Sequence, residues 1–107
     1  MKNRAPLESP VTTAILKTLN ALPDTYAVKL HGSMYGRVGT PDILVVRLRA
    51  WEGEPILGEY GQAYFLEVKR PGAKPTPAQL AEMAKWTDVG AVCCVVRSVQ
   101  EALDAVG

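Results

Sequence analysis

Apolar positions along this chain change from helical to strand-like spacing, and the change outlines a series of elements. Between Pro10 and Leu22 the apolar residues fall on one helical face, with Ser9 in the N-cap position. Segments follow in which apolar and β-branched residues alternate or run together, which is typical of strands. These strands are predicted over 26–30, 42–48 and 63–69, with glycine-containing loops over 31–41 and 50–62 between them.

The second half of the chain returns to helical spacing and then to a further strand. Thr76 and Gln79 stand in the positions of a capping box, with a proline between them at the first helical position. They predict a helix over 77–89 that ends at Gly90. The apolar run over 91–97 predicts a buried strand.

A second capping-box pattern, Ser98 with Glu101, predicts a short helix at the end of the sequence. The order of elements is therefore helix, three strands, helix, strand, helix. A strand that follows a helix after another strand indicates one parallel crossover, so an α/β fold with a mixed sheet is expected. The length of 107 residues fits a single domain over 1–107.

Composition and charge exclude few classes of function. The net charge is +1, so bulk charge neither indicates nor excludes a nucleic-acid partner. The sequence has no secretory pattern at its start and no apolar run of about 20 residues, so no membrane association and a cytoplasmic location are expected. Cys93 and Cys94 are neighbours that point to opposite faces of a strand, so we expect packing residues rather than a disulfide.

Charged residues inside the strand pattern are the first candidates for chemistry. Glu67 and Lys69 are two positions apart, so their side chains share one face of a strand. Asp42 opens the preceding strand after a glycine-rich loop, and it meets Glu67 if the two strands are neighbours. Two carboxylates beside a lysine suit a hard cation such as Mg²⁺ or Mn²⁺. A purely structural interpretation fits the same residues. In it, Asp42 caps a turn, and Glu67 and Lys69 stand on a solvated strand face.

The combination of three motifs is more specific than any one of them. The segments GTPD (39–42), EVKRPG (67–72) and TPAQ (76–79) occur in the order, and on the elements, of the VRR-NUC family, which the chain resembles. That family belongs to the PD-(D/E)xK nuclease superfamily. The resemblance implies a restriction-endonuclease-like αβββαβ core, with a mixed central sheet flanked by helices.

The resemblance also implies roles for particular residues. The implied catalytic residues are Glu8, Asp42, Glu67, Lys69 and Gln79. Asp42 and Glu67 would bind the metal, with the Val68 carbonyl as a third ligand and Glu8 completing the acidic cluster. Lys69 would orient or help deprotonate the attacking water, and Gln79 would position that water or Lys69. Gln79 also fits the capping box, and the two roles are compatible.

The implied activity is metal-dependent hydrolysis of phosphodiester bonds in DNA by an endonuclease. Stand-alone members of the family resemble junction-resolving enzymes, so branched or junction DNA is the expected substrate and a homodimer the expected assembly. Arg37, Arg70 and Lys74 are candidate contacts to DNA phosphates. The alternative is a DNA-structure-binding or accessory module without catalysis.

Overall fold

Three helices and four strands make up the described part of the chain, which is residues 8–31, 38–52 and 58–107 of a computed structural model. In chain order they are α1 (Glu8–Asn20), β1 (Thr25–Lys29), β2 (Ile43–Ala50), β3 (Glu59–Val68), α2 (Pro77–Asp88), β4 (Val92–Val96) and α3 (Val99–Val106). Each predicted element is present and in the predicted order. None of the described helices is long and apolar enough to cross a membrane.

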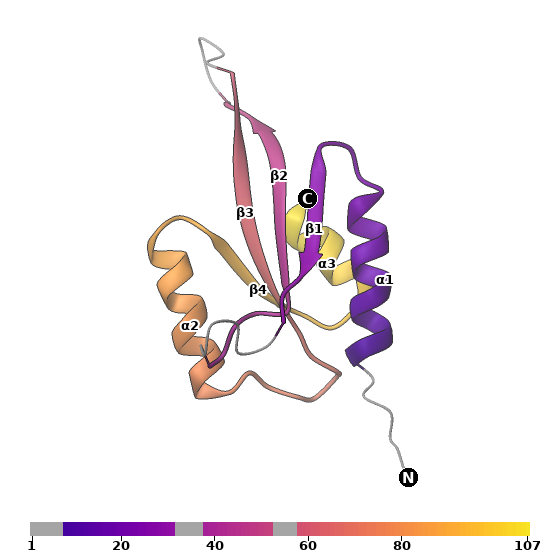
Figure 1. Cartoon of the computed structure of the whole chain (residues 1–107), viewed down its shortest axis with the longest axis vertical. Coiled ribbons are helices and arrows are strands. Elements are labelled where there is room, and N and C mark those ends of the chain that lie inside the picture. Colours follow the sequence, from indigo (N-terminus) through magenta and orange to yellow (C-terminus); the bar gives the residue numbers. More distant parts are fainter. Residues whose placement is uncertain (1–7, 32–37, 53–57) are drawn as a thin grey trace.

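The four strands form one mixed sheet in the order β1-β2-β3-β4. The pairs β1–β2 and β2–β3 are antiparallel, and β3–β4 is the predicted parallel pair, joined through α2. Figure 1 shows α2 and α1 on opposite sides of the strands. The fold is therefore a three-layer arrangement in which β3 is central, as its apolar sequence predicted.

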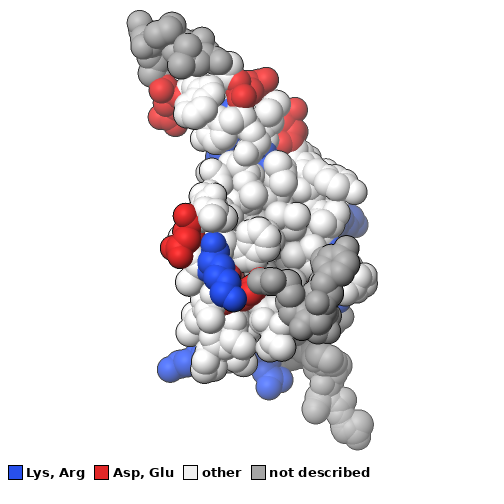
Figure 2. Space-filling model, turned by 60° about the vertical axis from the view of Figure 1, so that its left-hand side comes forward, with Lys and Arg blue, Asp and Glu red and all other residues white. Residues whose placement is uncertain are grey.

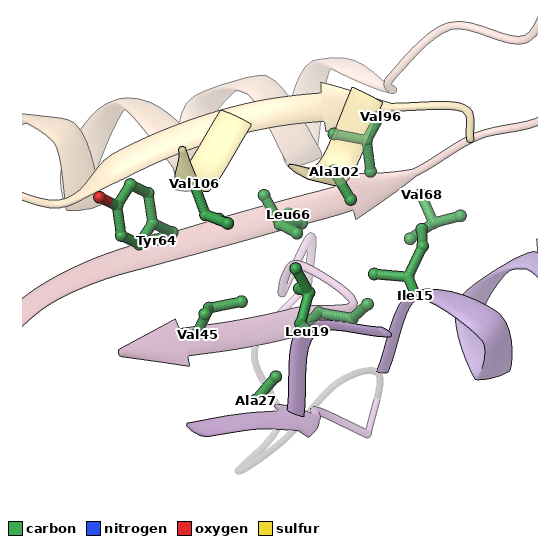
Figure 3. Packing of buried hydrophobic residues seen from close by; sticks show 11 residues of the cluster. Ile15, Leu19, Ala27, Val45, Tyr64, Leu66, Val68, Val96, Ala102 and Val106 are labelled. Atoms are coloured by element: carbon green, nitrogen blue, oxygen red, sulfur yellow. The ribbon is translucent and has the colours of Figure 1, made fainter. Parts of the chain in front are cut away.

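The main core lies between the sheet and the layer formed by α1 and α3. Side chains that alternate along the strands, such as Val45 and Leu66, point into this layer. Ile15 and Leu19 of α1 and Val106 of α3 close it from the other side, as Figure 3 shows. These residues are buried and together form one continuous cluster.

Among the described elements, α2 is the helix on the opposite face of the sheet, where it packs against β4 and the end of β3. The rings of Phe65 and Trp86 stack with centroids 4.5 Å apart. Glu67 is two positions beyond Phe65 and so shares this face. The face that bears the candidate chemistry is therefore the one under α2, away from the main core.

The hairpin between β2 and β3 is longer than the sequence predicted. The loop expected over 50–62 was wrong, because β3 begins at Glu59 and Ala50 pairs with it. Gly61 lies within β3, where an added Cβ would be 3.3 Å from Val46 Cγ1, so the glycine fits closely against β2. Cross-strand packing has overridden the local preference for a loop.

Three smaller expectations also need correction. The first helix begins at Glu8, so Ser9 lies inside it and is not its N-cap. The Ser98 side chain accepts the Glu101 N–H, but the Glu101 carboxylate accepts the N–H of Arg97, so the second capping box is only half formed. The strand over Val92–Val96 is an edge strand in which only Val96 is fully buried. Periodicity alone could not show that this strand has a neighbour on one side only.

Candidate active site

The loop before β2 brings Asp42 to the end of β3. The Asp42 N–H donates to the Leu66 carbonyl at 3.1 Å, which extends the β2–β3 ladder by one residue. One Asp42 carboxylate oxygen, Oδ2, accepts the N–H of Val68 at 2.7 Å. Asp42 is therefore held beside the last residue of the central strand, as the sequence predicted for neighbouring strands.

Glu67 lies beside Asp42 as a buried carboxylate, with 2% of its surface exposed. Its Oε2 accepts a hydrogen bond from Gln79 Nε2 at 3.0 Å and lies 3.5 Å from Lys69 Nζ. Its Oε1 is buried and has no hydrogen-bond partner among the described residues. A buried carboxylate oxygen without a partner is costly, so this atom is a candidate ligand.

Gln79 forms the predicted capping box and also contacts Glu67, while its role in positioning the water or Lys69 stays a prediction. Its Oε1 accepts the Thr76 N–H at 2.9 Å and its own N–H donates to the Thr76 hydroxyl, which completes the capping box. Its Nε2 then donates to Glu67. Because one end of the amide must accept and the other must donate, its orientation is determined. The first turn of α2 therefore holds Glu67 in place.

A glycine joins the loop before β2 directly to the same helical turn. Gly39 has φ +88°, and a Cβ placed on it would lie 2.5 Å from the Ala78 carbonyl oxygen and 3.0 Å from the Gln79 nitrogen. This backbone-to-backbone contact connects the segment that carries Asp42 to the helix that carries Gln79. In the sequence this glycine is part of the loop over 31–41 and of the GTPD segment, and no local pattern shows what lies against it.

The charges around Glu67 change its acidity. Burial and, to a smaller extent, the nearby Asp42 carboxylate raise the pKa of Glu67 from 4.5 to about 7, against the opposing effect of Lys69. A group that holds its proton more tightly when folded stabilises the fold at low pH. This stabilisation is complete below about pH 4.5 and is lost as the pH rises through about 7.

We therefore expect Glu67→Gln to remove a pH-dependent part of the stability of the metal-free protein. In the presence of chelator, the free energy of unfolding of the Glu67→Gln variant should exceed that of the parent by more at pH 8 than at pH 5. The measurement is urea unfolding at both pH values. A difference between the two proteins that is the same at both pH values would show that Glu67 does not titrate differently in the folded state.

The donor atoms at this end of the sheet fit a hard divalent cation. Two carboxylates with an unpartnered buried oxygen offer the ligands that Mg²⁺ and Mn²⁺ prefer. The Val68 N–H faces Asp42, and in an extended strand the carbonyl of the same residue points to the same side, so it is a further candidate ligand. Among the side chains that the structure describes, no three His, Cys, Asp or Glu residues converge. The side chain of Glu8 lies outside the described residues, so its role stays a prediction.

Basic residues follow the site along the chain. Arg70 and Lys74 are both exposed on the loop between β3 and α2. Arg97, the residue after β4, donates from Nη2 to the Ala73 carbonyl of that loop at 2.8 Å. Figure 2 shows acidic side chains near the tip of the β2–β3 hairpin and basic ones at the opposite end, where this loop lies. Arg37, the third predicted phosphate contact, lies outside the described residues.

The fold and these residues define a class of protein. A mixed four-stranded sheet between helical layers, with Asp42 just before β2 and with Glu67 and Lys69 where β3 ends, is a restriction-endonuclease-like nuclease fold. A solved structure described as a VRR_NUC domain is similar to 95% of this chain over 96% of its own length, with 31% sequence identity and a TM-score of 0.71. The chain belongs to the VRR-NUC family of nuclease-like domains. No protein-family model and no curated protein matches it.

Proposed function

We propose that this domain is a metal-dependent endonuclease that hydrolyses phosphodiester bonds in DNA. The observation that carries the proposal is the buried Glu67 carboxylate, with one oxygen free of described partners, beside Asp42 and 3.5 Å from Lys69 Nζ. A buried carboxylate beside a second, half-buried carboxylate is costly to the fold unless a cation or a proton offsets the charge. A site that binds a cation explains why both are present.

Asp42, Glu67 and the Val68 carbonyl would hold Mg²⁺ or Mn²⁺ in this proposal. When bound, such an ion stabilises charge on a phosphoryl oxygen and lowers the pKa of a water molecule. Gln79 donates to Glu67 Oε2 and so leaves Oε1 for the cation. The capping box holds Gln79 in position, which supports this assignment of Glu67 Oε2 to Gln79 and of Glu67 Oε1 to the cation.

Lys69 would act on the attacking water and on the phosphate rather than on the cation. Its ammonium group shares a sheet face with Glu67 and is mostly shielded from solvent, with 13% of the side chain exposed. At that position it would orient the attacking water, assist its deprotonation and offset the charge that develops on the phosphate. The chain needs no histidine for this chemistry.

The preferred substrate is branched or junction DNA, bound by a homodimer. One site cuts one strand, so symmetric cutting of two strands needs two copies of the site. Arg70 and Lys74 would contact phosphates without reading sequence. The proposal also keeps Arg37 as a phosphate contact and Glu8 as part of the acidic cluster, on the basis of the sequence alone. The single domain over 1–107 and the cytoplasmic location have the same basis.

Removal of the divalent cation tests this function most directly. We expect cleavage of junction DNA with Mg²⁺ or Mn²⁺, none in chelator, and DNA binding with little cleavage in Ca²⁺, because Ca²⁺ accepts looser coordination geometry. The measurement is gel analysis of labelled single-stranded, duplex, flap and four-way junction DNA, with binding followed in parallel.

A matched variant shows whether the metal acts at this site. In Asp42→Asn the carboxylate becomes an amide of the same size, so metal-dependent cleavage should be lost while the fold is kept. Full cleavage in chelator would refute the site. Tight binding to junctions, with no cleavage under any metal, would instead favour the accessory module.

A further inference from the structure

The side chain of Thr40, in the GTPD segment, carries a buried hydroxyl group without a hydrogen-bond partner. Among the residues that the structure describes, two buried side-chain atoms that can form hydrogen bonds have no partner, Thr40 Oγ1 and Glu67 Oε1. One belongs to GTPD and the other to EVKRPG, the two segments that meet at the candidate active site. A buried hydroxyl without a partner is costly, and proteins nearly always provide one. Both atoms therefore point to a ligand at this site.

The sequence around Thr40 fixes the position of its hydroxyl group. A proline follows it, and the residue before a proline is restricted to extended backbone. The β-branched side chain of a threonine also has few rotamers. Pro41 is fully buried, and Gly39 is held against α2, where an added Cβ would lie 2.5 Å from the Ala78 carbonyl oxygen. The hydroxyl group is therefore held in place by its own side chain and by both neighbours.

Thr40 lies where the loop before β2 crosses from α2 to β3. On one side, Gly39 packs against the first turn of α2, where an added Cβ would lie 3.0 Å from the Gln79 nitrogen. On the other side, the Asp42 N–H donates to the Leu66 carbonyl of β3. The same helical turn and the same strand carry the amide and the buried carboxylate that are hydrogen-bonded to each other in the site. The fold therefore places Thr40 between the elements that form the candidate active site.

A hydroxyl group complements the two carboxylates of this site. Ionised carboxylates only accept hydrogen bonds, whereas a hydroxyl group both accepts and donates and carries no charge. An ion such as Mg²⁺ keeps several of its water molecules when one or two carboxylates bind it. Each of these water molecules donates hydrogen bonds, so a neutral acceptor near Asp42 and Glu67 can bind one without adding charge to the site.

We propose that Thr40 is a further positioning residue of the metal site, whose hydroxyl group binds a water molecule of the divalent cation held by Asp42 and Glu67. The inference rests on the proposed function and deepens it, because it adds a group that raises the affinity of the same site for the cation. Partners of this kind, which act on the ligands of a metal rather than on the metal, typically change its affinity by about 10–100-fold.

Thr40→Val tests the proposal because valine has nearly the shape of threonine and lacks the hydroxyl group. The dissociation constant for Mn²⁺, measured from the electron paramagnetic resonance of the free ion, should rise by about 10-fold or more. In chelator the midpoint of urea unfolding should equal or exceed that of the parent, because an unpartnered buried hydroxyl is replaced by an apolar group. Thr40→Ser keeps the hydroxyl group and should bind Mn²⁺ nearly as the parent does.

Thr25→Val is the matched control, since it makes the same change at a hydroxyl group that has partners. Thr25 Oγ1 donates to the Pro23 carbonyl at 2.8 Å and accepts from Arg47 Nε at 2.9 Å. This variant should unfold at a lower urea concentration than the parent and bind Mn²⁺ with unchanged affinity. The two valine variants should therefore show opposite patterns of stability and metal binding.

Several outcomes would overturn the role of Thr40. They are an unchanged Mn²⁺ affinity in Thr40→Val, a lower urea midpoint of that variant in chelator, or an equal loss of affinity in Thr25→Val. Weaker binding of junction DNA by Thr40→Val at unchanged Mn²⁺ affinity would also overturn it, and would place the hydroxyl group against a phosphate.

The same measurements separate this inference from the proposed function. A parent that cleaves DNA, with Mn²⁺ affinity unchanged in Thr40→Val, would overturn the inference alone. A parent whose Mn²⁺ affinity depends on Thr40 but that cleaves no DNA would support the inference and overturn the nuclease. A parent that binds no Mn²⁺ would overturn both.

Discussion

Lys69→Ala should lower the rate of DNA cleavage by about 10²–10⁴-fold, the loss typical when an acid–base or charge-stabilising group is removed. Lys69 Nζ lies 3.5 Å from Glu67 Oε2, so the ammonium group is placed at the proposed metal and scissile phosphate. The fold should survive, because Lys69 follows the last strand residue and its backbone N–H still donates to the Val96 carbonyl. DNA binding should weaken far less than cleavage, since only one of several phosphate contacts is lost.

Single-turnover cleavage and binding assays on the same junction measure the two effects separately. Glu67→Gln is the comparison variant: it should also abolish cleavage, but through loss of metal, so excess Mn²⁺ should restore part of its activity. Excess Mn²⁺ should not restore Lys69→Ala. If Lys69→Ala cleaves at the parental rate, the lysine is only a partner of Glu67 and the proposed mechanism is wrong.

Gly39→Ala should reduce both stability and activity strongly. A Cβ on Gly39 would lie 2.5 Å from the Ala78 carbonyl, and neither backbone can move without shifting Asp42 or the first turn of α2. Left-handed backbone costs a non-glycine residue about 1–2 kcal/mol, and forced packing adds about 1–3 kcal/mol. We expect the free energy of unfolding to fall by about 3 kcal/mol and cleavage to fall with the displacement of Gln79.

Gly72→Ala separates the cost of the left-handed backbone from the cost of the collision with Ala78. Gly72 has a similar φ of +84° but no atom within 4 Å of an added Cβ, so this variant bears the backbone strain without the collision. Urea unfolding should show a loss of about 1 kcal/mol for Gly72→Ala, with activity near that of the parent. Equal losses in the two variants would mean that the contact between Gly39 and Ala78 does not connect the two parts of the site.

Local patterns account for the elements and for most of the candidate residues. Thr76 and Gln79 predict the start of α2 because a capping box needs only residues three apart, and the structure contains it. Glu67 and Lys69 share a face because strand side chains alternate, and their side chains meet at 3.5 Å. Such predictions depend on spacing along one segment, which the sequence contains in full.

The contacts between distant segments could not be predicted from spacing along one segment. Tertiary packing alone decided that β3 extends back to Glu59, since pairing with β2 outweighs the local tendency of Gly61 to break a strand. It also decided that Gly39 lies against Ala78 and that Gln79 serves both its helix and Glu67. The sequence by itself determined which groups are available and on which face of their own element they stand. Only the fold decided which of them meet, because that depends on the packing of whole layers rather than on any one stretch of residues.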